Sequence, residues 1–215
     1  MNDRIVLDQK LIESRHCYHC FKRIFDILMS SVGLIVLSPL MLLIAILIKC
    51  EDGGPVIYKQ KRVGKHEKIF RMYKFRSMVI NADSLIATLK SKNEVKGAMF
   101  KIKDDPRVTK IGHFLRKHSL DELPQLINVL LGNMSLVGPR PPIPSEVKQY
   151  TTYDKQRLYV VPGCTGLWQA TERNSVGFNE MVLLDLKYIA KASILFDFKI
   201  ILKTVVIILK PNQSY

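Results

Sequence analysis

The sequence predicts a helix-rich α/β membrane protein, with one apolar N-terminal helix and a small globular domain that contains short strands. Three patterns support this fold class. Residues 24–48 are almost uninterruptedly apolar, as in a membrane helix. Residues 68–75 alternate basic and apolar side chains, as a strand does. Residues 194–210 form a second apolar run, in which lysines recur at regular intervals.

The first apolar run is compatible with two arrangements in a membrane. At ~1.5 Å per residue, it would extend roughly 37 Å and could cross the hydrocarbon core. Ser38-Pro39 lies in its middle, and proline kinks a helix because it lacks an N–H group. Basic residues flank both ends, and such flanks are kept in the cytoplasm. The pattern therefore allows either a kinked spanning helix or a re-entrant helix that returns to the same side.

Short elements follow, separated by turn residues. The cluster at residues 51–55 returns the chain to water, and the proline-rich loop 139–144 is expected to be rigid. Strands are expected at residues 56–58 and 68–75. Helices are expected at residues 77–90, 109–117, 123–131, 145–160, 179–190 and 194–210.

The last of these helices has two interpretations. Its length and its lysines, Lys199, Lys203 and Lys210, suit an amphipathic helix that lies on the membrane surface. The same pattern also suits a core helix whose lysines face water.

The net charge of +14, with a pI near 9.7, indicates an anionic partner. Nucleic acid is excluded as that partner, because the sequence has no zinc-finger or RNP motif and contains a long apolar run. Its four cysteines indicate no secreted disulfide framework, so we expect them to be reduced and cytoplasmic. Two of them lie in the cluster 16–20, which is too compact to wrap a tetrahedral zinc ion.

Two adjacent carboxylates, Asp121 and Glu122, stand out in this basic chain. Ser119 followed by Glu122 matches a helix capping box. Pro124, however, favours a helix that begins near Leu123, with the two acids at its mouth. A carboxylate among cations can also act as a nucleophile, a base or a metal ligand for a phosphorylated substrate.

Several motifs, taken in order, resemble the bacterial sugar transferases, and in particular the small monotopic polyprenol-phosphate phosphoglycosyl transferases. The resemblance covers residues 22 to about 210. Its marks are the Lys22-Arg23 start, Ser38-Pro39, residues 54–64, residues 73–78, Asp105-Pro106-Arg107, Asp121-Glu122, residues 136–141, residues 162–169 and residues 184–188.

The resemblance implies a two-step reaction. Asp121 would attack the sugar-bearing phosphorus of a UDP-sugar and release UMP, and undecaprenyl phosphate would then displace the aspartate. Glu122 matches the acid that binds Mg²⁺ in this family. A helix N-terminus at Leu123 would help to keep Asp121 ionised. The expected phosphate and substrate ligands are Lys74, Arg76, Arg107, Arg116, Arg140, Gln169, Arg173 and Asp185.

For the membrane helix, the resemblance favours the re-entrant form, with a break at Ser38-Pro39. The expected organisation is an N-terminal arm at residues 1–21, a re-entrant helix at 22–50, and a catalytic domain at 51–215. That domain would lie on the cytoplasmic face of the bacterial inner membrane. The expected partners are the two substrates, membrane lipids, a second copy of the chain and downstream glycosyltransferases.

Trp168 favours a hexose donor, UDP-glucose or UDP-galactose, for the initiation of capsule or exopolysaccharide synthesis. The alternatives are an N-acetylated donor for a glycoprotein glycan, or a basic protein that binds lipid headgroups without catalysis. The last of these predicts that Asp121→Asn changes nothing.

Overall fold

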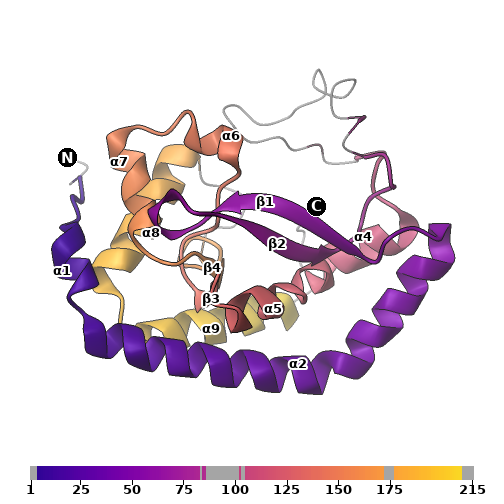
Figure 1. Cartoon of the computed structure of the whole chain (residues 1–215), viewed down its shortest axis with the longest axis horizontal. Coiled ribbons are helices and arrows are strands. Elements are labelled where there is room, and N and C mark those ends of the chain that lie inside the picture. The colour runs from indigo at the N-terminus through magenta and orange to yellow at the C-terminus, as the bar shows by residue number, and fades with distance from the viewer. Residues whose placement is uncertain (1–3, 83, 86–101, 103–104, 172–176, 210–215) are drawn as a thin grey trace.

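The computed structural model describes residues 4–82, 84–85, 102, 105–171 and 177–209. It confirms a helix-rich α/β protein (Figure 1). In chain order, the elements are α1 (Gln9–Glu13), α2 (His16–Asp52), β1 (Ile57–Val63), η1 (Lys65–Glu67), β2 (Ile69–Phe75), α4 (Lys110–Lys117), η3 (Leu120–Glu122), α5 (Gln125–Leu130), β3 (Ser135–Val137), α6 (Pro144–Val147), α7 (Thr152–Lys155), η4 (Gln156–Tyr159), β4 (Gly163–Thr165), α8 (Phe178–Lys191) and α9 (Ile194–Leu209).

The apolar run lies in α2, which is one continuous helix and extends beyond the run at both ends. The expected break at Ser38-Pro39 is therefore wrong as an interruption, although the helix bends along its length (Figure 1). Pro39 has no N–H group for the carbonyl of Ile35, and the Ser38 hydroxyl donates to that carbonyl instead, at 2.8 Å. Serine before proline thus compensates for the missing backbone bond.

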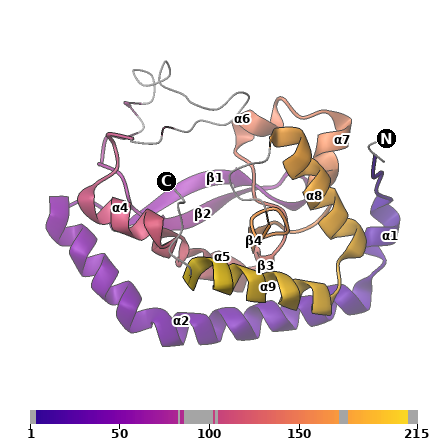
Figure 2. The same cartoon turned by 180° about the vertical axis from the view of Figure 1, so that it is seen from behind.

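Both ends of α2 bond to the globular part of the chain. Near its start, Lys22 forms an ion pair with Asp197 of α9 at 2.8 Å. Figure 2 shows α9 lying alongside this part of α2. At its end, Asp52 forms an ion pair with Arg76. In between, the buried Asp26 accepts a hydrogen bond from Leu136 N at 3.0 Å, which accounts for a charged residue in an apolar helix.

The rest of α2 is largely uncovered. It is the one helix among the described residues that is long and apolar enough to cross a membrane, and 11% of its most apolar stretch is buried. A core helix of a soluble protein would be mostly buried, so this exposure supports a membrane protein. The apolar side chains that α2 exposes include Phe21, Leu28, Val32, Ile35, Val36, Leu42, Leu43 and Ile46.

Strands β1 and β2 form an antiparallel hairpin, and β3 and β4 form a short parallel pair. Strand β1 extends to Val63, five residues beyond the expected end at Tyr58. The prediction stopped too early because residues 59–62 are polar, yet the side chain of Arg62 turns inward and is buried. The hydrophobic core lies where α8 and α9 pack against β3, around Val137 and Leu186.

The other helix predictions met mixed outcomes. Helices α4, α5, α8 and α9 confirm four of them within a few residues, although Lys210 lies outside the described residues. The helix expected at 145–160 is split into α6, α7 and η4, because Thr151 and Asp154 form a capping box that starts a new helix. The described part of 77–90 forms a bridge at Met78 and turns, so the expected helix is wrong there.

Candidate active site

The carboxylate pair lies on the 3₁₀ turn η3, between α4 and α5. Helix α4 is capped by Thr109, and Gly112 lets it approach β2's end, since any Cβ there would collide with the backbone of Ser77. Ser119 then adopts φ 55° and makes no side-chain capping bond. The capping interpretation is therefore wrong, and Asp121 and Glu122 are held at the mouth of α5.

Asn128 of α5 fixes the pair relative to strand β2. Its side-chain oxygen accepts from Tyr73 N at 2.8 Å, and its side-chain nitrogen donates to Arg71 O at 2.7 Å. One amide thus bonds the strand edge as a neighbouring strand would. Lys74, the next residue on β2, reaches the Glu122 carboxylate at 2.6 Å. Sequence reasoning missed Asn128, which no local pattern distinguishes from an ordinary helix residue.

The two carboxyl groups differ in their environments. Asp121 keeps 8% of its surface exposed, and burial raises its pKa against the opposing attraction of Lys74 and Arg116. Burial also acts to raise the pKa of Glu122, but Lys74, Arg140 and Arg62 outweigh it, so that pKa lies below its ordinary value. The helix N-terminus was expected to help keep Asp121 ionised, but burial has the larger effect and raises the pKa of Asp121. The surrounding cations therefore favour the ionised form more strongly at Glu122 than at Asp121.

Of the predicted phosphate ligands, Lys74, Arg116 and Arg140 act electrostatically on the pair. The Nε of Arg116 donates to the Ser77 hydroxyl at 2.9 Å. Arg140 forms an ion pair with Glu146 at 3.4 Å. Arg62 is a further cation near the pair, and the prediction missed it because the strand was expected to end before it. These side chains make a positively charged surrounding for an anionic substrate.

Other predicted ligands bond elsewhere. Arg76 pairs with Asp52, and Arg107 pairs with the buried Asp105 at 2.6 Å. Asp185 is 0% exposed and bonds Arg157 at 2.6 Å. Arg76 and Asp185 join segments that are distant in the sequence, whereas Arg107 bonds Asp105 within one turn. A substrate-binding role for all three stays a prediction.

The remaining two predicted ligands lie beyond the Gly166 turn. The Gln169 side-chain oxygen is buried and has no hydrogen-bond partner among the residues that the structure describes. Arg173 lies outside the described residues.

A Mg²⁺ ion would find a suitable oxygen ligand in Glu122. Mg²⁺ uses one or two carboxylates and takes its other ligands from substrate phosphates and water. The Glu122 side chain is 44% exposed and favours its ionised form. Within the described ranges, no cluster of three or more acidic, His or Cys side chains could hold a metal without such help. The site therefore fits a metal that arrives with a phosphorylated substrate.

The fold and the site together define a membrane-associated protein with a carboxylate pair set among cations. The chain matches the family of bacterial sugar transferases over residues 17–211, and it belongs to that family. This confirms the resemblance drawn from the motifs.

Three relatives illustrate the range of the family. The chain is 48% identical over 189 residues to the galactosyl transferase CpsE of Streptococcus agalactiae serotype III (strain NEM316), covering 87% of this chain and 42% of the relative. It is 44% identical over 198 residues to the undecaprenyl-phosphate galactose phosphotransferase of Salmonella typhimurium, covering 90% and 41%. It is 41% identical over 198 residues to the exopolysaccharide production protein ExoY of Sinorhizobium fredii, covering 90% and 88%. The chain thus spans less than half of the first two relatives and most of the third.

Proposed function

We propose that this chain transfers a sugar 1-phosphate from a UDP-hexose to undecaprenyl phosphate and releases UMP. The observation that carries the proposal is the Asp121–Glu122 pair, set on a turn with Lys74, Arg116 and Arg140 around it. Phosphoryl transfer needs mainly positioning and the neutralisation of phosphate charge, which this arrangement supplies.

In the first step, a carboxylate oxygen of Asp121 attacks the phosphorus that bears the sugar. The bond from that phosphorus to the UMP oxygen breaks, and UMP leaves with the electron pair. In the second step, an oxygen of undecaprenyl phosphate attacks the same phosphorus, and the Asp121 carboxylate leaves unchanged. Lys74 and Arg116 favour the ionised form of Asp121 that the first step requires.

Glu122 would hold Mg²⁺ together with the donor's phosphates. The ion, when bound, withdraws charge from the phosphate oxygens as a Lewis acid. Lys74 bonds Glu122 at 2.6 Å and keeps that carboxylate ionised for its ligand role.

We further propose that the chain is monotopic, with α2 re-entering the side from which it came. Lys22 and Asp52 lie near opposite ends of α2, and both form ion pairs with the globular domain. A helix that crosses the bilayer would separate these ends by the whole hydrocarbon core. The bonds at both ends therefore support a single side, which the basic flanks assign to the cytoplasmic face of the inner membrane.

The exposed face of α9 supports the interfacial role of this helix. Its inner face packs in the core at Ile200, while Leu195, Phe198 and Leu202 face outward among Lys199 and Lys203. Apolar side chains beside lysines suit the boundary between headgroups and acyl chains. The active site would then lie at the depth of the acceptor's phosphate.

Galactose is named for the first two relatives, and a hexose donor agrees with Trp168. The product would initiate a capsule or exopolysaccharide. Assembly as a homodimer and transfer of the product to downstream glycosyltransferases stay predictions.

The deciding experiment measures UMP release by purified protein with undecaprenyl phosphate, Mg²⁺ and a panel of UDP-hexoses and N-acetylated UDP-sugars. Asp121→Asn should abolish release, whereas Glu180→Gln, which removes an exposed carboxylate from α8, should not. Intact mass spectrometry with donor alone should detect a hexose-phosphate adduct on the wild-type chain. Undiminished UMP release by Asp121→Asn would refute the nucleophile assignment.

A further inference from the structure

The loop that carries Arg140 is anchored through its backbone carbonyl oxygens. In Pro139-Arg140-Pro141-Pro142, only Arg140 has a backbone N–H group, because proline has none. The loop can therefore be fixed by hydrogen bonds almost only through its carbonyl oxygens.

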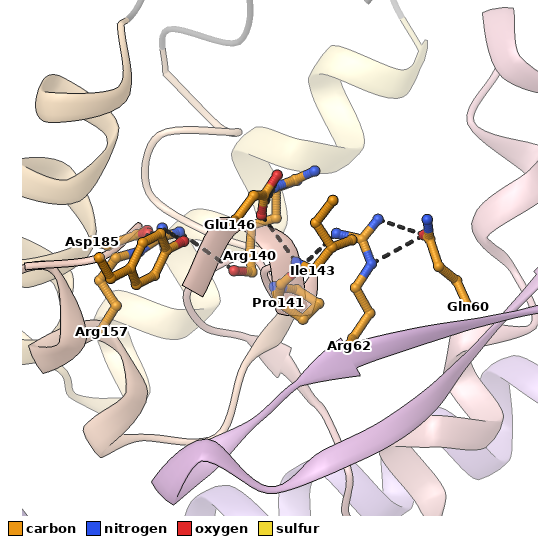
Figure 3. A network of polar contacts seen from close by, with 9 residues as sticks. Gln60, Arg62, Arg140, Pro141, Ile143, Glu146, Arg157 and Asp185 are labelled. Atoms are coloured by element: carbon orange, nitrogen blue, oxygen red, sulfur yellow. Dashed lines mark hydrogen bonds and ion pairs between the residues drawn. The ribbon is translucent and has the colours of Figure 1, made fainter. Parts of the chain in front are cut away.

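All four of these carbonyls accept a hydrogen bond. Two donors are backbone amides, and two are guanidinium groups. The bonds are Gly163 N to Pro139 O (2.9 Å), Arg157 Nη2 to Arg140 O (3.4 Å), Arg62 Nη1 to Pro141 O (2.8 Å) and Val63 N to Pro142 O (2.9 Å). Figure 3 shows the two arginines approaching the loop from opposite sides.

Both arginines are almost fully buried, which is costly for a charged group. Arg157 is compensated by an ion pair with Asp185 and a 2.8 Å hydrogen bond to Tyr150. Arg62 bonds the side-chain oxygen of Gln60, and none of the ion pairs found in the described part of the chain includes it. Burial of this charge carries a desolvation cost, which the hydrogen bonds of Arg62 to Gln60 and to Pro141 O offset.

Arg62 also lies close enough to Arg140 for the two charges to repel. Burial, with this repulsion, lowers the pKa of Arg62 to about 10. Repulsion would turn Arg140 away from its neighbour if the loop were free. The Arg140 guanidinium is partly exposed and pairs with Glu146 at 3.4 Å, and it lies near enough to Glu122 to act on that carboxylate electrostatically.

We propose that Arg62 and Arg157 are positioning residues, two buried guanidinium groups that hold the loop's carbonyls and thereby aim Arg140 at a donor phosphate. Asp185, which bonds Arg157, belongs to the same support. The inference rests on the proposed function, since it assigns Arg140 to the phosphates of the UDP-sugar.

A double-mutant cycle tests whether the two arginines act through Arg140. Arg62→Met, and the paired change Arg157→Met with Asp185→Val, should each lower kcat/KM roughly 10- to 100-fold. The pair removes both buried charges together, so the fold is retained. In an Arg140→Ala background, the same changes should cost several-fold less, because the residue they position is gone and only the direct electrostatic effect of Arg62 remains.

Lys22→Met is the matched control, since it removes a mostly buried cation whose ion pair with Asp197 lies in another part of the fold. Lys22→Met should change kcat/KM by the same factor in the wild-type and Arg140→Ala backgrounds. If the Arg62 and Arg157 variants also show equal effects in both backgrounds, the positioning role is refuted.

Amide hydrogen exchange gives a readout that does not depend on activity. The amides of Val63 and Gly163 donate to the loop, so both should exchange faster in the Arg62→Met and paired variants than in Lys22→Met. If these two amides exchange at the same rate in the arginine variants as in Lys22→Met, the proposal is overturned. A wild-type chain that makes no product from any UDP-sugar would refute the proposed function instead, and exchange would then decide the positioning of the loop by itself.

Discussion

Lys74 and Glu122 form an ion pair in which 2.6 Å separates Nζ from Oε1, and it joins strand β2 to the turn before α5. Both side chains are partly exposed, so the pair contributes little to the stability of the fold. Its consequence is local: one ammonium group neutralises Glu122 and lies close enough to act on Asp121. The cation is thus shared by the metal-binding and nucleophilic candidates.

Replacement of Lys74 by Met should lower kcat/KM for the donor by roughly 10²-fold, because a preorganised charge at the phosphate site is lost. Lys59→Met is the matched control. Lys59 lies on the neighbouring strand β1, is exposed, and is paired with Tyr73 rather than with either carboxylate. In steady-state measurements of UMP release, kcat/KM of Lys59→Met should stay near the wild-type value. Equal losses in both variants would indicate a general effect of net charge.

The pH dependence should reflect the raised pKa of Asp121. The nucleophile is the ionised form, so activity should increase with pH as the carboxyl loses its proton. Because burial raises that pKa above the ordinary value of 3.8, the acid limb of kcat/KM should lie above 3.8. Lys74 opposes the rise, so Lys74→Met should move the limb to still higher pH, whereas Lys59→Met should leave it in place. A limb that moves downward in Lys74→Met would contradict the assignment.

Asn128 should be needed for both stability and activity. Asn128→Ala leaves Tyr73 N and Arg71 O without their partner, at a cost of about 2–4 kcal/mol in unfolding free energy. Asn133→Ala, on the exposed turn that follows α5, is the control and should change little. Thermal unfolding in detergent measures the first effect, and UMP release at a temperature where both variants are folded measures the second. Full activity in a destabilised Asn128→Ala would confine Asn128 to a structural role.

Local patterns were enough to predict the long apolar helix, four of the later helices and strand β2. The capping-box pattern at Ser119 is equally local, yet the structure does not use it, since Ser119 adopts a left-handed conformation. The prediction ended strand β1 too early because arginine is usually a surface residue, whereas Arg62 is buried. Its burial depends on Pro141 O, which lies 79 positions away in the sequence.

Part of the candidate site also follows from local sequence, and its catalytic role stays a prediction. Asp121 and Glu122 are adjacent, and their chemistry can be inferred from their side chains. The supports of the site are long-range: Asn128 bonds β2, and Arg157 bonds Asp185 across 28 positions. A single sequence contains no signal for such pairings, so Asp185 was predicted as a ligand although it is buried as a partner of Arg157.

The topology of α2 can be tested with the protein's own cysteines. Cys17 and Cys20 lie near the start of α2, Cys50 lies near its end, and all three are exposed. If both ends of α2 bond the same domain in the membrane, as in Lys22–Asp197 and Asp52–Arg76, both sets should face the cytoplasm. A membrane-impermeant maleimide should then label neither set in intact spheroplasts and both sets in inverted membrane vesicles.

Two variants separate the ends: Cys17→Ser with Cys20→Ser leaves the end of α2 reactive, and Cys50→Ser leaves its start reactive. Cys164, which is less exposed than the other three cysteines, should react faster after denaturation in either variant and so reports on an intact fold. Labelling of one end in spheroplasts and of the other only in inverted vesicles would establish a spanning helix. In that case the ion pair at one end of α2 would be broken in the membrane. A disulfide that replaced this ion pair and held the two positions together should then abolish activity. Labelling of both ends from the cytoplasmic side keeps both ion pairs intact and leaves the active site at headgroup depth, where a lipid-linked phosphate can reach Asp121.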